Sequence, residues 1–74
     1  MVKMVAHLYD DMDWVRIFVE ENYFALMDCH INLEDQINKK GAEKTLNQCR
    51  LYRVGKWYKR EWGYECKVSW SKPK

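Results

Sequence analysis

Strict alternation of apolar and polar residues near the C-terminal end is the feature that most constrains the fold. Residues at every second position of a strand point to the same face of a sheet, so alternation predicts a half-buried strand. The polar members between residues 64 and 70 are Glu65, Lys67 and Ser69. The apolar members are Tyr64, Cys66, Val68 and Trp70. This stretch therefore predicts a strand with one face in the core and one face in water.

Two further strands are expected before it. Residues 49–54 also alternate, and Gly55 followed by Lys56 has the Gly-X form of a two-residue hairpin turn. Residues 57–62 then read as the returning strand, and Gly63 turns the chain into the final one. The C-terminal part is thus predicted to be a three-stranded antiparallel meander.

The sequence pattern of the N-terminal part allows more than one secondary structure. Residues 2–9 are predicted as a strand, and residues 10–13 interrupt it with three acids. Residues 14–27 have two interpretations. The first is a hairpin whose tight turn uses Asn22, and the second is a helix capped by Asp13. The β-branched and aromatic residue types favour the hairpin.

A short helix is expected in the middle of the chain. Asn32 at the cap and acids in the first turn favour a helix over residues 33–40, with a break at Gly41 and one or two further helical turns after it. With 74 residues the chain has room for one modest core. The sequence therefore predicts a small α+β fold, with residues 1–74 as a single domain.

The cysteines and the N-terminal residues bear on the compartment. No secretory signal or membrane span is recognised, so we expect a cytoplasmic protein that does not contact a membrane. Three cysteines cannot all pair within one chain, and we expect them to be reduced. A metal site from Cys29, His30, Cys49 and Cys66 is disfavoured because the ligand spacing is wide. No cofactor motif is found.

Charge is divided unevenly along the chain. The formal net charge is only +2, yet residues 1–37 hold two cations and eight acids, whereas residues 38–74 hold eleven cations and three acids. Cations alternate with aromatic residues in the basic part, as in proteins that stack bases on rings and neutralise phosphates. The candidate binding residues are Arg50, Arg53, Lys56, Trp57, Tyr58, Lys59, Arg60 and Trp62.

These patterns predict a small binding domain without enzymatic activity. The favoured partner is DNA or RNA, either single-stranded or bound through its backbone, on the basic aromatic sheet. The alternative is a modulator or inhibitor that docks on and blocks a larger protein, such as a nucleic-acid enzyme, using both charged surfaces. Its acidic docking residues would be Asp10, Asp11, Asp13, Glu20 and Glu21.

Two alternatives are kept beside that prediction. A small basic nuclease using His7 or His30 is the enzymatic one, although no motif places either histidine beside a second catalytic group. A homodimer is the other, because a second row of rings on the sheet could be shared between two copies and a chain of this size has little core of its own.

Overall fold

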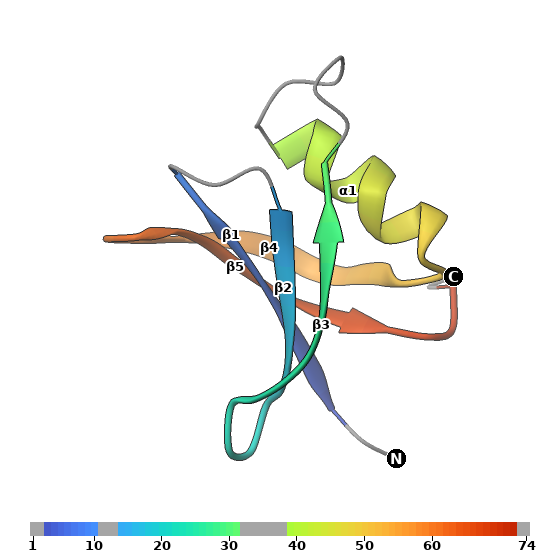
Figure 1. Cartoon of the computed structure of the whole chain (residues 1–74), viewed down its shortest axis with the longest axis horizontal. Coiled ribbons are helices and arrows are strands. Elements are labelled where there is room, and N and C mark those ends of the chain that lie inside the picture. Colours follow the sequence, from blue (N-terminus) through green and yellow to red (C-terminus); the bar gives the residue numbers. More distant parts are fainter. Residues whose placement is uncertain (1–2, 11–13, 32–38, 73–74) are drawn as a thin grey trace.

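The structure, a computed structural model, describes residues 3–10, 14–31 and 39–72. Within them lie five strands and one helix, and all neighbouring strands are antiparallel. The strands form one sheet in the order β3-β2-β1-β5-β4, and the helix lies along one face of it (Figure 1). The elements are β1 (Met4–Tyr9), β2 (Trp14–Val19), β3 (Phe24–His30), α1 (Lys39–Gln48), β4 (Tyr52–Arg60) and β5 (Gly63–Ser69). The expected α+β class in one small domain is confirmed.

The hairpin interpretation of the N-terminal part is the one observed. Strands β2 and β3 pair antiparallel, with Trp14 opposite His30 and Val19 opposite Phe24. The positive φ in the connection belongs to Tyr23 (51°) and not to Asn22. Asn22 instead accepts a hydrogen bond from the backbone N–H of Phe24 through its Oδ1, at 3.0 Å. A short polar side chain thus stabilises the turn, as in an Asx turn.

The predicted turn at Gly55 and Lys56 is wrong. Strand β4 continues through both residues, and the C-terminal part is a two-stranded hairpin instead of a three-stranded meander. The register shifts between Val54 and Tyr58, and Gly55 has a φ of 84°. A glycine at positive φ suits a β-bulge as well as a turn. The chain reverses later, through Glu61 and Trp62.

The predicted break at Gly41 is also wrong, because Gly41 lies inside α1. Of the expected helix over residues 33–40, residues 33–38 lie outside the described part. A glycine inside a helix costs about 1 kcal/mol relative to alanine. Full burial of Ala42 and Leu46 against the sheet offsets that cost.

The C-terminal end of α1 explains why Arg50 is not in a strand. Arg50 has a φ of 62°, and its N–H donates to the carbonyl of Asn47 at 3.1 Å. The N–H of Leu51 donates to the carbonyl of Leu46 at 2.8 Å, and both leucine side chains are fully buried. These two bonds form a Schellman motif, in which arginine takes the position that glycine usually occupies.

The core lies between α1 and the sheet. It takes every second residue of β1, as expected for a strand with one face in the core, together with apolar residues of β2, β3, β5 and the helix. Trp57, Tyr64 and Cys49 pack against its edge. In the described part, no helix has the length and apolar character that crossing a membrane requires. The buried members are Met4, Ala6, Leu8, Val15, Ile17, Cys29, Ile31, Ala42, Leu46, Leu51, Cys66 and Val68.

Candidate binding surface on the open sheet face

The face of the sheet opposite α1 carries rings and charges in place of an apolar core. Among the described elements only α1 covers the sheet, so this opposite side is named the open face (Figure 1). Its side chains come from β1, β2, β4, β5 and the two hairpin connections. They are His7, Tyr9, Arg16, Phe18, Tyr23, Tyr58, Arg60, Trp62, Glu65 and Lys67.

His7 lies at the centre of the open face and is covered by rings. Its ring centroid is 4.4 Å from that of Trp62, 4.6 Å from that of Phe18 and 5.7 Å from that of Tyr23. Trp62 is in turn 5.1 Å from Tyr9, and Phe18 is 6.1 Å from Tyr23. Only 8% of His7 is exposed. The two ring pairs, Trp62 with Tyr9 and Phe18 with Tyr23, are therefore joined through His7 into one layer, in which His7 itself is buried.

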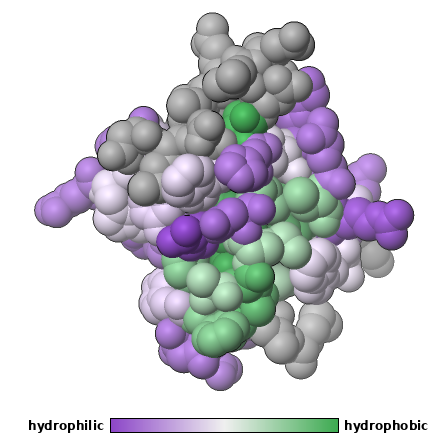
Figure 2. All heavy atoms as spheres, in the orientation of Figure 1, coloured by the Kyte–Doolittle hydropathy of each residue, from purple (hydrophilic) through white to green (hydrophobic). Residues whose placement is uncertain are grey.

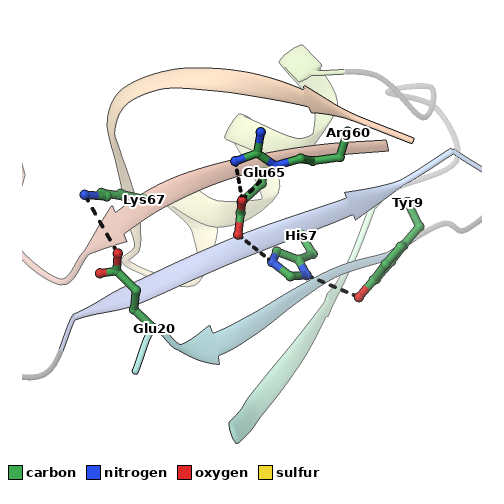
Figure 3. A network of polar contacts seen from close by, with 6 residues as sticks. All are labelled: His7, Tyr9, Glu20, Arg60, Glu65 and Lys67. Carbon is green, nitrogen blue, oxygen red and sulfur yellow. Dashed lines mark hydrogen bonds and ion pairs between the residues drawn. The ribbon is translucent and has the colours of Figure 1, made fainter. Parts of the chain in front are cut away.

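Glu65 connects this layer to the cations. Its carboxylate bonds His7 Nε2 at 2.9 Å, accepts a hydrogen bond from Arg60 Nε at 3.0 Å and forms an ion pair with Arg60 Nη2 at 2.9 Å (Figure 3). Partial burial raises the pKa of Glu65, but the bonds from His7 and Arg60 outweigh it and hold that pKa below its usual range. Glu65 is therefore an anion at neutral pH, and it fixes both His7 and Arg60.

A shallow hollow lies beside Glu65. It encloses about 210 Å³, and its lining includes Tyr23, Tyr58, Arg60 and Lys67. At its far side Lys67 Nζ is 3.8 Å from Glu20 Oε1 (Figure 3). Tyr58 also lies under Arg60, with 5.7 Å between Cζ and the ring centroid. The hollow thus combines aromatic walls with two cations and suits a flat, polar ligand.

The structure divides the residues predicted for nucleic-acid binding. Tyr58, Arg60 and Trp62 gather on the open face. Arg53 lies on the other side, where its guanidinium bonds the Glu43 carboxylate of α1, and Trp57 packs against the core there. The remaining three lie apart from both groups: Arg50 caps α1, Lys56 is exposed at the bulge of β4, and Lys59 lies 4.8 Å from the Tyr64 ring centroid.

The acidic residues predicted for docking do not form one patch. Asp10 follows β1 and lies 4.0 Å from Lys59 Nζ, whereas Glu20 follows β2 and faces Lys67. Because β1 and β2 run antiparallel, these two carboxylates are at opposite ends of the sheet. Glu21 is exposed in the connection next to Glu20. Asp11 and Asp13 lie outside the described residues.

Several residues of the open face were not among the candidate binding residues: His7, which was named only for the nuclease alternative, and Tyr9, Arg16, Phe18, Tyr23, Glu65 and Lys67. The alternation of apolar and polar residues between 64 and 70 could have indicated two of them, because Glu65 and Lys67 form the polar face of that predicted strand. Arg16 could have been assigned to this face in the same way, from its position in the strand β2. It donates to the Asp28 carboxylate from Nε and Nη2 at 2.7 and 3.1 Å.

Two of the three cysteines, Cys29 and Cys66, are buried thiols of low reactivity. Burial raises the pKa of Cys66 to about 12, and burial together with a hydrogen bond to Cys49 raises that of Cys29 to about 12. In the described part of the chain no three His, Cys, Asp or Glu side chains come together as metal ligands. His30 contacts the Trp14 ring edge-on, at 5.9 Å between centroids.

No protein-family model, curated protein or solved structure matches the chain.

Proposed function

We propose that the protein binds single-stranded nucleic acid on the open face, with bases stacked on its rings and phosphates held at its margin. The observation that carries this proposal is the continuous layer of rings on a sheet face that no described element covers. Unstacked bases need such a surface, because stacking on an aromatic side chain replaces the stacking lost from the strand. Binding without a chemical step is proposed, since His7 is buried.

Three rings are exposed enough to receive bases. Tyr23 is 54% exposed, Tyr58 52% and Trp62 36%. Stacking of one base on one ring contributes about 1–3 kcal/mol, so three such contacts give about 3–9 kcal/mol, and with added phosphate contacts they reach the roughly 8 kcal/mol of a micromolar affinity without base-specific hydrogen bonds. The hollow beside Glu65 lies between Tyr23 and Tyr58 and offers a place for one base edge.

The cations of the open face are available to phosphates. Arg16, Arg60 and Lys67 each face a carboxylate, but their side chains are 38%, 46% and 61% exposed. Arg16 pairs with Asp28, which is also exposed. Exposed ion pairs contribute little to stability, so a phosphate oxygen can displace that carboxylate at little cost. Arg60 would instead receive a phosphate beside Glu65, whose side chain is only 14% exposed and keeps its bonds. Three phosphate contacts on a single strand predict a slope of about −2 in a plot of log K against log salt.

The experiment is fluorescence anisotropy with a labelled, mixed-sequence single-stranded oligonucleotide over a range of salt concentrations. Trp62→Ala removes the ring over His7 and is expected to weaken binding about tenfold to a hundredfold. Trp70→Ala is the matched control, because Trp70 is also an exposed tryptophan but lies after the end of β5 and is not one of the residues of the open face. Lack of binding at low salt, or equal losses in the two variants, would overturn the proposal.

A second candidate is a protein partner docked on the same face, as a modulator or inhibitor. One observation favours it: each open-face cation already faces a carboxylate, so the surface is nearly neutral and rich in rings, as protein interfaces are. In that case Trp62→Ala weakens partner binding, whereas the oligonucleotide shows no salt-dependent binding. Either function is compatible with the cytoplasmic location expected for three free thiols.

A further inference from the structure

The outer strand β3 is an uncovered apolar edge. It has β2 as its neighbour on one side and no described strand on the other, so half of its backbone N–H and C=O groups point away from the sheet. Phe24 is 64% exposed, Leu26 45% and Met27 39%. Green, apolar atoms gather over the lower part of β3 in Figure 2. Large apolar side chains on an edge strand mark a place where another strand pairs.

A bulge brings these side chains together. The register of β2 with β3 shifts so that Ile17 lies opposite Met27 and Phe18 lies opposite Ala25, which leaves Leu26 as the extra residue. Two residues opposite one point to nearly the same side of a sheet. Leu26 and Met27 therefore extend the core beyond Ile17, which is itself fully buried. The result is an apolar strip that begins in the core and ends at an open edge.

We infer that β3 pairs with β3 of a second copy of this chain, in an antiparallel two-fold dimer. Charge favours this occupant over other partners. The one acid of β3, Asp28, is neutralised by Arg16, so self-pairing brings apolar side chains together without like charges. The opposite edge strand, β4, carries Arg53, Lys56, Lys59 and Arg60 and a bulge at Gly55. Those features protect β4 from pairing, and β3 lacks the cations.

The size of the chain supports the same occupant. A domain of 74 residues buries a modest core, and oligomerisation is one of the ways in which such small domains gain stability. A two-fold β3 pair joins two five-stranded sheets into one of ten strands, with the apolar strips of both copies in contact. The inference does not rest on the proposed function, because Phe24, Leu26 and Met27 are not in the ring layer and the two share only the Arg16–Asp28 pair.

The test is sedimentation or light scattering of the full chain from about 1 µM to about 500 µM. A monomer–dimer equilibrium is expected. Met27 is the middle residue of β3, so a two-fold pair centred on it brings the two Met27 side chains close together. Met27→Lys then places two cations close to each other and should raise the dimer dissociation constant at least about a hundredfold. Val54→Lys is the matched control, because Val54 is an exposed aliphatic residue on the opposite edge strand, and this variant should dimerise as the original chain does.

A charge-swap experiment separates a lost interface from a damaged fold. Met27→Lys and Met27→Glu are each expected to be monomeric, and a mixture of the two should form a heterodimer because the opposite charges then meet across the two-fold axis. A monomer at every concentration would overturn the inference. A dimer that Met27→Lys leaves intact, or that Val54→Lys weakens equally, would overturn it as well.

Discussion

Replacement of Gly63 by alanine tests the close contact between β1 and β5. A Cβ at this position would lie 2.0 Å from the Leu8 carbonyl oxygen, and 3.0 Å from both the Leu8 carbonyl carbon and the Tyr9 Cα. All three are backbone atoms of the central strand, so no side chain can move aside. Gly63 also has a φ of 149°, which L side chains rarely adopt. The same residue begins β5 directly after Trp62, and so it sets where that ring lies.

The magnitude follows from three contributions. Backbone strain at a positive φ costs about 1–3 kcal/mol. Moving β1 away from β5 also weakens the last backbone hydrogen bond between these two strands. It further weakens the adjacent hydrogen bond from the Asp10 N–H to the Trp62 carbonyl, which is 3.1 Å long in the original protein. Each lost hydrogen bond costs about 1 kcal/mol. The sum is about 3–5 kcal/mol, a large part of the roughly 4–11 kcal/mol that a domain of this size has.

Gly55→Ala provides the matched control. Gly55 has a φ of 84°, but a Cβ there would meet no atom within 4 Å. Only the conformational strain remains, and we expect a loss of about 1 kcal/mol. For a chain of this length 1 kcal/mol corresponds to about 6 °C in Tm. Gly55→Ala should therefore lower Tm by about 6 °C, and Gly63→Ala by about 20–30 °C.

Thermal melts followed by circular dichroism, with urea titrations beside them, measure both differences. An unfolded Gly63→Ala protein next to a folded Gly55→Ala protein agrees with the reasoning. Equal stability of the two variants would refute it, because the contact with the Leu8 carbonyl would then not constrain the sheet.

Two further predictions concern titratable groups. The pKa of Glu65 is lowered in the folded state, so its contribution to stability is complete above the unfolded value of about 4.3 and is lost as pH falls through the folded value. Glu65→Gln should thus be less stable than the original chain at pH 7, and its free energy of unfolding should fall less steeply below about pH 4, as measured by urea titrations. Parallel pH profiles of the two proteins would contradict this. Because burial raises the pKa of Cys29 and Cys66 to about 12, iodoacetamide at pH 8 should label the less buried Cys49 first and label the other two quickly only in denaturant. Equally fast labelling of Cys66 in the folded protein would show that it is not protected.

The parts of the fold that depend on local pattern were predictable. Strand β5 follows from the alternation around Cys66, and β1 follows from the parity of Met4 and Leu8. The hairpin of β2 and β3 follows from residue types that favour strands. For β1 and β5 the period of two appears within six or seven residues, and for the hairpin the residue types are sufficient, so no knowledge of the partner strand is needed.

The parts that depend on distant partners were not predictable. A Gly-X pair suits a turn and a bulge alike, and only the pairing of Val54 with Lys67 and of Tyr58 with Glu65 decides that Gly55 is in a bulge. Gly41 continues the helix because its neighbour Ala42 is buried against the sheet, which no local signal shows.

The candidate site was predicted in part for the same reason. Tyr58, Arg60 and Trp62 were recognised from cations alternating with rings. His7 was named only as a candidate residue of a small nuclease, and it lies on the face opposite the core. Its burial comes from Phe18, Tyr23 and Trp62, which belong to two different hairpins. A sequence pattern cannot show that these three rings meet.

The position of β1 in the middle of the sheet has a consequence for synthesis. One of its neighbours, β2, follows within a few residues, but the other, β5, leaves the ribosome roughly sixty residues later. The growing chain therefore carries β1 with one open side while β2, β3 and α1 emerge, and only β5 closes it. Folding on the ribosome is thus expected to complete in a single late step, and a stall in translation before Gly63 would leave the nascent chain exposed to aggregation and to chaperones.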